Sequence, residues 1–210
     1  MAHTYDFWMF DLDGTIVDIE PSYPTAVVTD VGDRLGVGFT EREAEILWYG
    51  LGGVREHVLQ RHGIDPDLFW EVFHDVENPA ERAAATYLYD DAASFVGSLD
   101  GPVGLVTHCQ PYLTEPVLDR LDIRDWFDTV VCCSEETGWK PDPTPVEMAM
   151  TDLDVAHNGH EGVLVGDDPD DVGAAWNAGL DAIHVERYDP DERGQCVLGD
   201  HRVRGFDDLV

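Results

Sequence analysis

The chain has 210 residues, of which 43% are hydrophobic, so it can bury the core of one sizeable domain, alone or with an insertion. Acidic residues outnumber basic ones by 44 to 12, a formal net charge of −32 that disfavours nucleic acid and anionic membranes as partners. No apolar run reaches about 18 residues, and the first residues do not resemble a signal peptide. We therefore expect a cytoplasmic protein that does not bind membranes.

Acid that is spread along a chain with few cations resembles the composition of halophilic proteins. At molar salt the Debye length is only about 3 Å, so self-repulsion is muted. An ordinary acidic cytosolic protein is the alternative. The four cysteines, Cys109, Cys132, Cys133 and Cys196, show no CxxC spacing. We expect them to be reduced, apolar residues rather than zinc ligands or members of disulfides.

The first predicted element is a short buried strand over about residues 6–11. It ends in Asp11-Leu12-Asp13-Gly14-Thr15. Side chains two apart on an extended backbone point the same way, so Asp11 and Asp13 reach one spot beyond the strand. Two close carboxylates repel each other unless a cation or a proton lies between them, and a hard ion such as Mg2+ suits oxygen ligands. The alternative is a strand that runs into an ordinary Asp-Gly turn.

Residues 16–87 show helical spacing of apolar residues and no further buried strand. Thr40 and Glu43 form a plausible capping box, and Asp65-Pro66 is typical of a helix start. We predict an insertion of about four helices after the first strand.

From residue 90 the pattern changes to short apolar runs that alternate with helical stretches. The predicted helices are 90–99, 111–121, 143–152 and 169–178, and the predicted strands are 103–107, 129–133, 162–166 and 181–185. This alternation is typical of a parallel sheet, here with five strands once the first is included, in an α/β fold. The polar tail, 186–210, is expected to cover an edge, with Phe206 and Leu209 as anchors.

Polar residues follow the predicted strands in order. They are Asp11 and Asp13 after the first, Thr107 and His108 after the second, Lys140 in the loop after the third, and Asp167, Asp168, Asp170 and Asp171 after the fourth. Lys140 is the only lysine of the chain, and a compact ammonium suits a point charge on phosphate or carboxylate. Each residue has a plain structural interpretation, such as helix capping for the aspartates. Because ligands bind at the carboxyl ends of parallel strands, the occurrence of these polar residues after four successive strands favours one shared site.

These residues resemble the motifs of the haloacid dehalogenase superfamily. The matching segments are Phe10-Asp11-Leu12-Asp13-Gly14-Thr15, Val106-Thr107, Gly138-Trp139-Lys140-Pro141-Asp142-Pro143 and Val165-Gly166-Asp167-Asp168-Pro169-Asp170-Asp171. The resemblance implies a Rossmann-like three-layer core at 1–15 and 88–210. It also implies that residues 16–87 are an all-helical cap, similar to the phosphoglycolate phosphatase-like branch.

The resemblance also implies phosphate monoester hydrolysis with Mg2+. Asp11 would be the nucleophile that forms an aspartyl-phosphate, and Asp13 would be general acid and then general base. Thr107 and Lys140 would hold the phosphate. The metal ligands would be the side chains of Asp11 and Asp167 and the backbone carbonyl of Asp13. Asp168 and Asp171 would surround these ligands.

The substrate would be a small phosphorylated metabolite. Asp13 argues against dehalogenation, since by resemblance the dehalogenases lack an acid there. His108 replaces a frequent Asn and either contacts substrate or shapes the turn. Arg55 either pairs with a substrate carboxylate or is one more surface arginine. A phosphomutase with the same residues and a non-catalytic binding protein are the alternatives, and neither the oligomeric state nor the substrate follows from the sequence.

Overall fold

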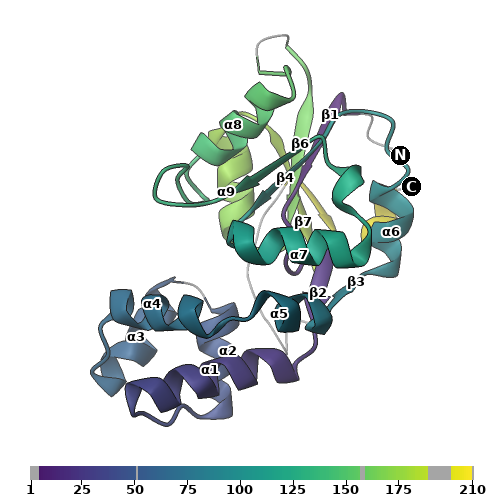
Figure 1. Cartoon of the computed structure of the whole chain (residues 1–210). Helices are drawn as coiled ribbons and strands as arrows, with labels where there is room; N and C mark the ends of the chain where they lie inside the picture. Colours follow the sequence, from purple (N-terminus) through teal and green to yellow (C-terminus); the bar gives the residue numbers. More distant parts are fainter. Residues whose placement is uncertain (1–4, 51, 157–158, 189–199, 210) are drawn as a thin grey trace. The chain divides into compact units, whose positions relative to one another are not determined.

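The computed structural model describes residues 5–50, 52–156, 159–188 and 200–209 (Figure 1). The chain divides into two compact units. The first, here called the core unit, comprises Met1–Asp18 and Tyr87–Val210, and the second, the helical unit, is Ile19–Thr86. Cys109, Cys132 and Cys133 are free, as predicted. Cys196 and the first four residues, on which the prediction about a signal peptide depends, lie outside the described residues.

The core unit alternates strands and helices along the chain. Its elements are β1 (Phe7–Phe10), α6 (Asp90–Val96), β4 (Val103–Thr107), α7 (Pro111–Leu121), η1 (Arg124–Trp126), β5 (Thr129–Cys132), α8 (Thr144–Asp152), β6 (Gly162–Gly166), α9 (Pro169–Asn177), β7 (Asp181–Val185), β8 (His201–Val203) and η2 (Phe206–Leu209). The predicted α/β fold is confirmed, and each predicted strand lies within about two residues of its place.

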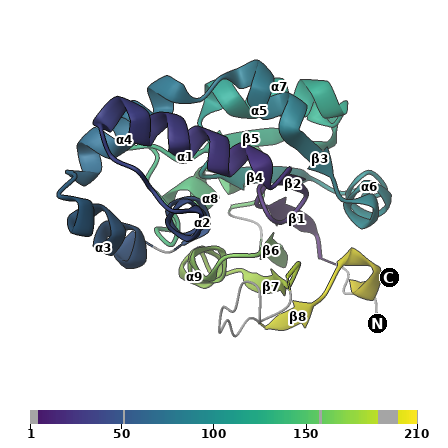
Figure 2. The same cartoon turned by 90° about the horizontal axis from the view of Figure 1, so that it is seen from below.

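Among the described residues, six strands form the main sheet, in the order β5-β4-β1-β6-β7-β8 (Figure 2). Every neighbouring pair is parallel. The prediction of five strands was therefore one short, since β8 adds a parallel strand at the β7 edge. This strand has three residues, of which only Val203 is buried, so it is too short to show an alternating pattern. The tail is anchored as predicted, because Phe206 and Leu209 are both buried.

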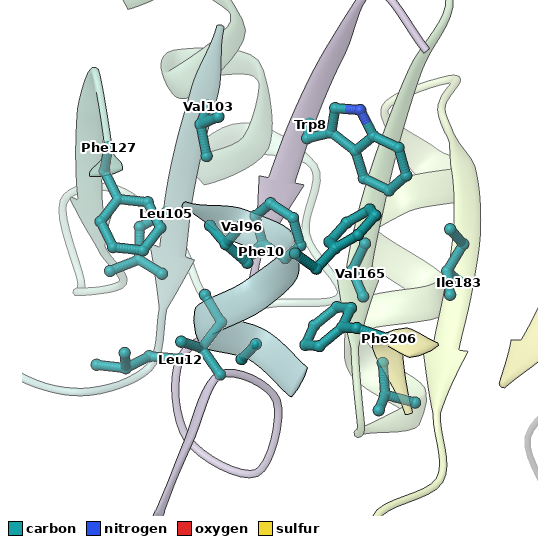
Figure 3. Packing of buried hydrophobic residues seen from close by; sticks show 14 of the residues in the cluster. Trp8, Phe10, Leu12, Val96, Val103, Leu105, Phe127, Val165, Ile183 and Phe206 are labelled. Atoms are coloured by element: carbon teal, nitrogen blue, oxygen red, sulfur yellow. The ribbon is translucent and has the colours of Figure 1, made fainter. Parts of the chain in front are cut away.

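The two faces of the sheet are covered by different helices. On β1, Trp8 and Phe10 belong to one apolar cluster and Phe7 and Met9 to the other, as the two-residue period of a strand requires. The first cluster packs against α6 and η2 (Figure 3). The second cluster packs against α8 and α9. Burial on both faces explains why these strands are continuous apolar runs.

The helical unit has its own apolar core. Its described part contains α1 (Ser22–Leu35), α2 (Glu41–Tyr49), α3 (Gly52–His62), α4 (Pro66–Val76) and α5 (Pro79–Ala85), one helix more than predicted. The predicted helix starts are confirmed: Thr40 and Glu43 form a capping box on α2, and Asp65 caps α4, with Pro66 at its first position. The core of the unit includes Leu47, Leu59, Phe69 and Phe73.

One prediction about residues 16–87 was wrong. The stretch contains a buried strand, β2 (Val17–Ile19), which pairs with β3 (Thr86–Leu88) in a separate two-stranded sheet. The insertion is therefore not wholly helical. Strands of three residues carry little local signal, because pairing and burial rather than propensity decide whether they form.

The strand order creates a switch point at β1. The chain runs from β1 to β4 and β5 on one side, and then returns to β6, β7 and β8 on the other. Polar residues that follow β4, β1 and β6 are therefore neighbours at the carboxyl edge of the sheet, where open α/β sheets bind ligands. In the part of the chain that the structure describes, no helix is long and apolar enough to cross a bilayer.

Candidate active site

Asp11 stands at the end of β1, between the two strands that flank it. Its backbone N–H donates to the carbonyl of Val165 at 2.9 Å, which continues the pairing of β1 with β6 by one residue. The chain then turns sharply, because the N–H groups of Ile16 and Val17 both donate to the Leu12 carbonyl at 3.0 Å. Asp11 is only 6% exposed, so its carboxylate is held in a site with little bulk water.

Gly14 is required in this turn for two reasons. Its φ of +82° lies in the left-handed region, and a Cβ would lie 2.4 Å from Oδ2 of Asp167. The turn after β1 is thus in direct contact with the carboxylate at the end of β6. Asp13 lies half-buried in the same turn, which is closed by a bridge between Asp13 and Val17.

Lys140 connects three parts of the site through its ammonium group. Nζ donates to Oδ1 of Asp11 at 2.7 Å, to Oδ1 of Asp171 at 2.6 Å and to the Val106 carbonyl at 2.9 Å. The side chain is 2% exposed. Burial alone would lower the pKa of Lys140, but the two carboxylates more than offset it and hold this pKa above its ordinary value. The only lysine of the chain is therefore charged and uses all three of its donors.

Three carboxylates of the described residues form a group that could hold a metal ion. They come from Asp11, Asp167 and Asp171, with one oxygen of each within 4.8 Å of the others. Burial, together with the neighbouring carboxylates, raises the pKa of Asp11 to about 7 although Lys140 opposes the shift. Burial and the charge of Asp11 also raise the pKa of Asp167 well above its ordinary value. A hard divalent cation would relieve this repulsion, and an all-oxygen donor set fits Mg2+.

The start of α9 orients two of the predicted acidic residues. Asp168 is the N-cap and accepts from the Asp170 N–H at 2.9 Å, while Oδ2 of Asp171 accepts from the Asp168 N–H at 3.0 Å. The other oxygen of Asp171 binds Lys140, so this carboxylate connects the helix start to the site. Burial and the Asp171 charge raise the pKa of Asp168 to about 6. Gly166 leaves the room that Asp171 needs, since a Cβ there would lie 2.2 Å from its carboxyl carbon.

Thr107 and His108 follow β4 at the same edge of the sheet. Thr107 is 1% exposed, and its Oγ1 accepts from the Cys109 N–H at 3.0 Å, which leaves its own hydroxyl proton available to donate. The His108 ring packs edge-on against Trp139, with 5.6 Å between ring centroids. His108 thus lies beside the residue that precedes Lys140.

Thr15 is a member of the site to which the sequence assigned no role. Its Oγ1 lies 3.5 Å from Oδ2 of Asp11 and 3.5 Å from Oδ1 of Asp167. Its signal in the sequence was its place at the end of the matching segment Phe10-Asp11-Leu12-Asp13-Gly14-Thr15.

Arg55 belongs to the helical unit. It lies on α3, where its Nη2 donates to the Trp48 carbonyl at 2.8 Å and its guanidinium carbon lies 5.6 Å from the centre of the Trp70 ring. The structure therefore brings together four of the predicted residues of the core unit, namely Asp11, Lys140, Asp167 and Asp171. Asp13, Thr107, His108 and Asp168 lie at or just after the ends of the neighbouring strands, and Arg55 is packed within the helical unit.

Known proteins are similar to this chain over most of its length. Residues 8–185 match the family described as haloacid dehalogenase-like hydrolase. The phosphoglycolate phosphatase of Nitrosospira multiformis is 30% identical over 184 residues, which cover 81% of this chain and 78% of that protein. The phosphoglycolate phosphatase of Escherichia coli (strain K12) is 27% identical over 200 residues, which cover 83% of this chain and 78% of that protein.

Two solved structures show the same fold. A putative phosphoglycolate phosphatase from Lactobacillus plantarum superimposes with a TM-score of 0.78 at 25% identity, over 99% of this chain and 98% of that chain. A β-phosphoglucomutase from Clostridium difficile gives a TM-score of 0.71 at 17% identity, over 99% and 94%. The second likeness concerns the fold alone.

Proposed function

The chain belongs to the haloacid dehalogenase-like hydrolases, and we propose that it is a Mg2+-dependent phosphatase for a small phosphate monoester, with phosphoglycolate as the first candidate. The predicted superfamily and enzyme class, a phosphoric monoester hydrolase, are confirmed by the family match and the relatives. The observation that carries the proposal is the buried Lys140, which bridges Asp11 and Asp171 beside Asp167.

Asp11 is the proposed nucleophile. Lys140 binds one of its oxygens, and the other lies near the Thr15 hydroxyl, so the carboxylate is held in one orientation. In the first step a carboxylate oxygen of Asp11 bonds to phosphorus, the bond from phosphorus to the substrate oxygen breaks, and Asp13 gives its proton to the leaving alkoxide. In the second step Asp13 takes a proton from water, whose oxygen attacks phosphorus and releases inorganic phosphate and free Asp11.

The residues that would hold Mg2+ are Asp11, Asp167 and the backbone carbonyl of Asp13. When bound, the ion would neutralise charge between the Asp11 carboxylate and the substrate phosphate. Asp168 and Asp171 would support the ligands from the start of α9, Asp168 as the helix cap and Asp171 through Lys140. Thr107 would donate a hydrogen bond to a phosphate oxygen, and Lys140, whose three donors are already used within the site, would hold the phosphate by its charge.

The names of the relatives suggest phosphoglycolate, an anion with a carboxylate besides its phosphate. Arg55 and His108 stay the candidates for the part of the substrate beyond the phosphate. The proposal includes the helical unit, Ile19–Thr86, as the cap predicted at residues 16–87, with a role in substrate choice. The proposal also places the protein in a salt-rich cytoplasm, which is supported by the net charge of −32 and the single lysine.

Phosphate release from a panel of esters tests the proposal. The panel contains phosphoglycolate, sugar phosphates and nucleoside monophosphates, in molar KCl, with Mg2+ or EDTA. Wild type is compared with Asp11→Asn and with Asp30→Asn, an exposed control on α1. We expect Mg2+-dependent release from wild type and the control, and none from Asp11→Asn.

Equal release by wild type and Asp11→Asn, or no release from any ester, would overturn the phosphatase proposal. A requirement for a bisphosphate activator would indicate a phosphomutase, which uses the same residues. Phosphate binding without turnover would indicate a non-catalytic binding protein on this fold.

A further inference from the structure

Arg187 lies two residues beyond β7, and its guanidinium is directed at the turn that follows the proposed nucleophile. Nη2 and Nε donate to the Thr15 carbonyl at 2.7 and 3.2 Å. Nη1 pairs with Oδ2 of Asp91 at 2.7 Å, and the side chain is only 6% exposed. A buried arginine that places two donors on one backbone carbonyl fixes that carbonyl in both distance and direction.

Thr15, whose carbonyl Arg187 holds, lies close to the proposed catalytic carboxylates. The Thr15 hydroxyl lies 3.5 Å from Asp11 and 3.5 Å from Asp167, and Asp13 is only two residues earlier in the same turn. The turn is short and closed, with Gly14 N–H bonded to the Val17 carbonyl at 2.7 Å. A shift of the Thr15 carbonyl would therefore move Asp13 as well.

The guanidinium is itself held from several directions. It lies 4.0 Å from the centre of the Tyr89 ring and 4.9 Å from that of Phe206. Oδ2 of Asp91 also accepts from the Phe206 N–H at 2.7 Å. Burial alone would raise the pKa of Asp91, but the bonds from Arg187 and Phe206 outweigh it and hold this pKa below its ordinary value. Arg187 is therefore a fixed point and not a mobile surface arginine.

We propose that Arg187 is a positioning residue, which acts through the Thr15 carbonyl to hold Asp13 where it can protonate the leaving alkoxide. This inference rests on the proposed function. It extends the site to the segment that follows β7, 172 residues from Thr15 in the sequence.

The test compares two esters that differ in their need for a proton. Phosphoglycolate expels an alkoxide, which needs the acid, whereas p-nitrophenyl phosphate expels a stabilised phenolate, which does not. Release of the leaving group is measured in single turnovers, with saturating Mg2+, for wild type, Arg187→Met and Arg187→Lys. Arg202→Met is the control, since Arg202 on β8 pairs with Glu186 at the same sheet edge and is 45% exposed.

General acid catalysis contributes about 10²- to 10⁴-fold, so a displaced acid should cost a measurable part of this factor. We expect Arg187→Met to slow release from phosphoglycolate at least about tenfold more than release from p-nitrophenyl phosphate. Arg187→Lys should show an intermediate ratio, because one ammonium cannot reproduce the forked contact. The control should keep the wild-type ratio.

An equal fall for both esters would mean that Arg187 only supports folding, and would overturn the inference. Wild-type release rates for both esters in Arg187→Met would overturn it as well. If Arg187→Met does not fold, the ratio for Arg187→Lys decides. Absence of release from both esters by wild type would instead defeat the proposed phosphatase function.

Discussion

Lys140→Met replaces the buried ammonium with an apolar side chain of similar length. Asp11 and Asp171, which lie 2.7 and 2.6 Å from Nζ, then lose their common cation. At an effective dielectric constant of about 20, each pair at about 3 Å attracts by roughly 5 kcal/mol before desolvation is subtracted. Measured losses on breaking a buried pair from one side are about 3–5 kcal/mol, and we expect a loss of free energy of unfolding in this range at pH 8.

The size of this loss should depend on pH. The metal-free site raises the pKa values of Asp11 and Asp167, so protonation of these groups relieves the repulsion that Lys140→Met exposes. The destabilisation should therefore be smaller at pH 5.5 than at pH 8. Urea unfolding in molar KCl with EDTA measures both values. Arg42→Met is the matched control, because its pair with Glu45 is exposed and is worth at most about 1 kcal/mol.

A double variant tests whether the pair is the cause. Asp171→Asn removes one of the carboxylates, so Lys140→Met/Asp171→Asn should lose less stability than the sum of the single variants. Strict additivity, or a loss below about 1 kcal/mol at pH 8 for Lys140→Met alone, would refute the reasoning from buried charge.

Four further outcomes follow. A carboxyl group whose pKa is raised in the folded state destabilises that state as pH climbs from its ordinary pKa to its folded pKa, so without metal the ionisation of Asp11 should lower Tm between about pH 4 and 7. Mg2+ should therefore raise Tm most at pH 8. Thermal scans with EDTA and with Mg2+ measure this effect, and an effect of Mg2+ that does not change with pH would contradict the prediction. Thr40→Ala removes the capping box of α2 and should cost about 1 kcal/mol in urea unfolding, with Thr40→Ser close to wild type; equal values for Ala and wild type would count against the cap. Gly14→Ala would force a Cβ to 2.4 Å from Asp167 and should abolish turnover, whereas Gly36→Ala, with a similar φ but open space, should keep it; an active Gly14→Ala would contradict the site geometry. With a net charge of −32, Tm should rise as KCl increases from about 0.1 to 2 M, and a constant Tm would remove the argument for salt adaptation.

The sheet was predictable because its strands are buried on both faces. Val103–Thr107 and Gly162–Gly166 are continuous apolar runs, bounded by helical stretches, and the structure has them at the predicted residues. Parallel order then places every strand end at one edge, which is why Asp11, Thr107 and Asp167 could be grouped without knowing any distance. Their proposed roles depend on the resemblance and on experiment.

Other features had no local signal. Strands β2 and β8 have three residues each, and their pairing rather than their composition makes them strands. The contact from Arg187 to the Thr15 carbonyl joins residues 172 apart, and a backbone acceptor leaves no trace in the sequence. Lys140 stood out as the only lysine, but its simultaneous contact with Asp171 depends on how α9 begins.

The central claim is that Asp11 forms a covalent bond to phosphorus. The most direct measurement uses phosphoglycolate labelled with radioactive phosphorus, mixed with the enzyme in molar KCl and quenched with acid after milliseconds. We predict acid-stable label on wild-type protein in the presence of Mg2+, none with EDTA and none on Asp11→Asn. Turnover by wild type without any labelled protein, or equal labelling of Asp11→Asn, would contradict the account.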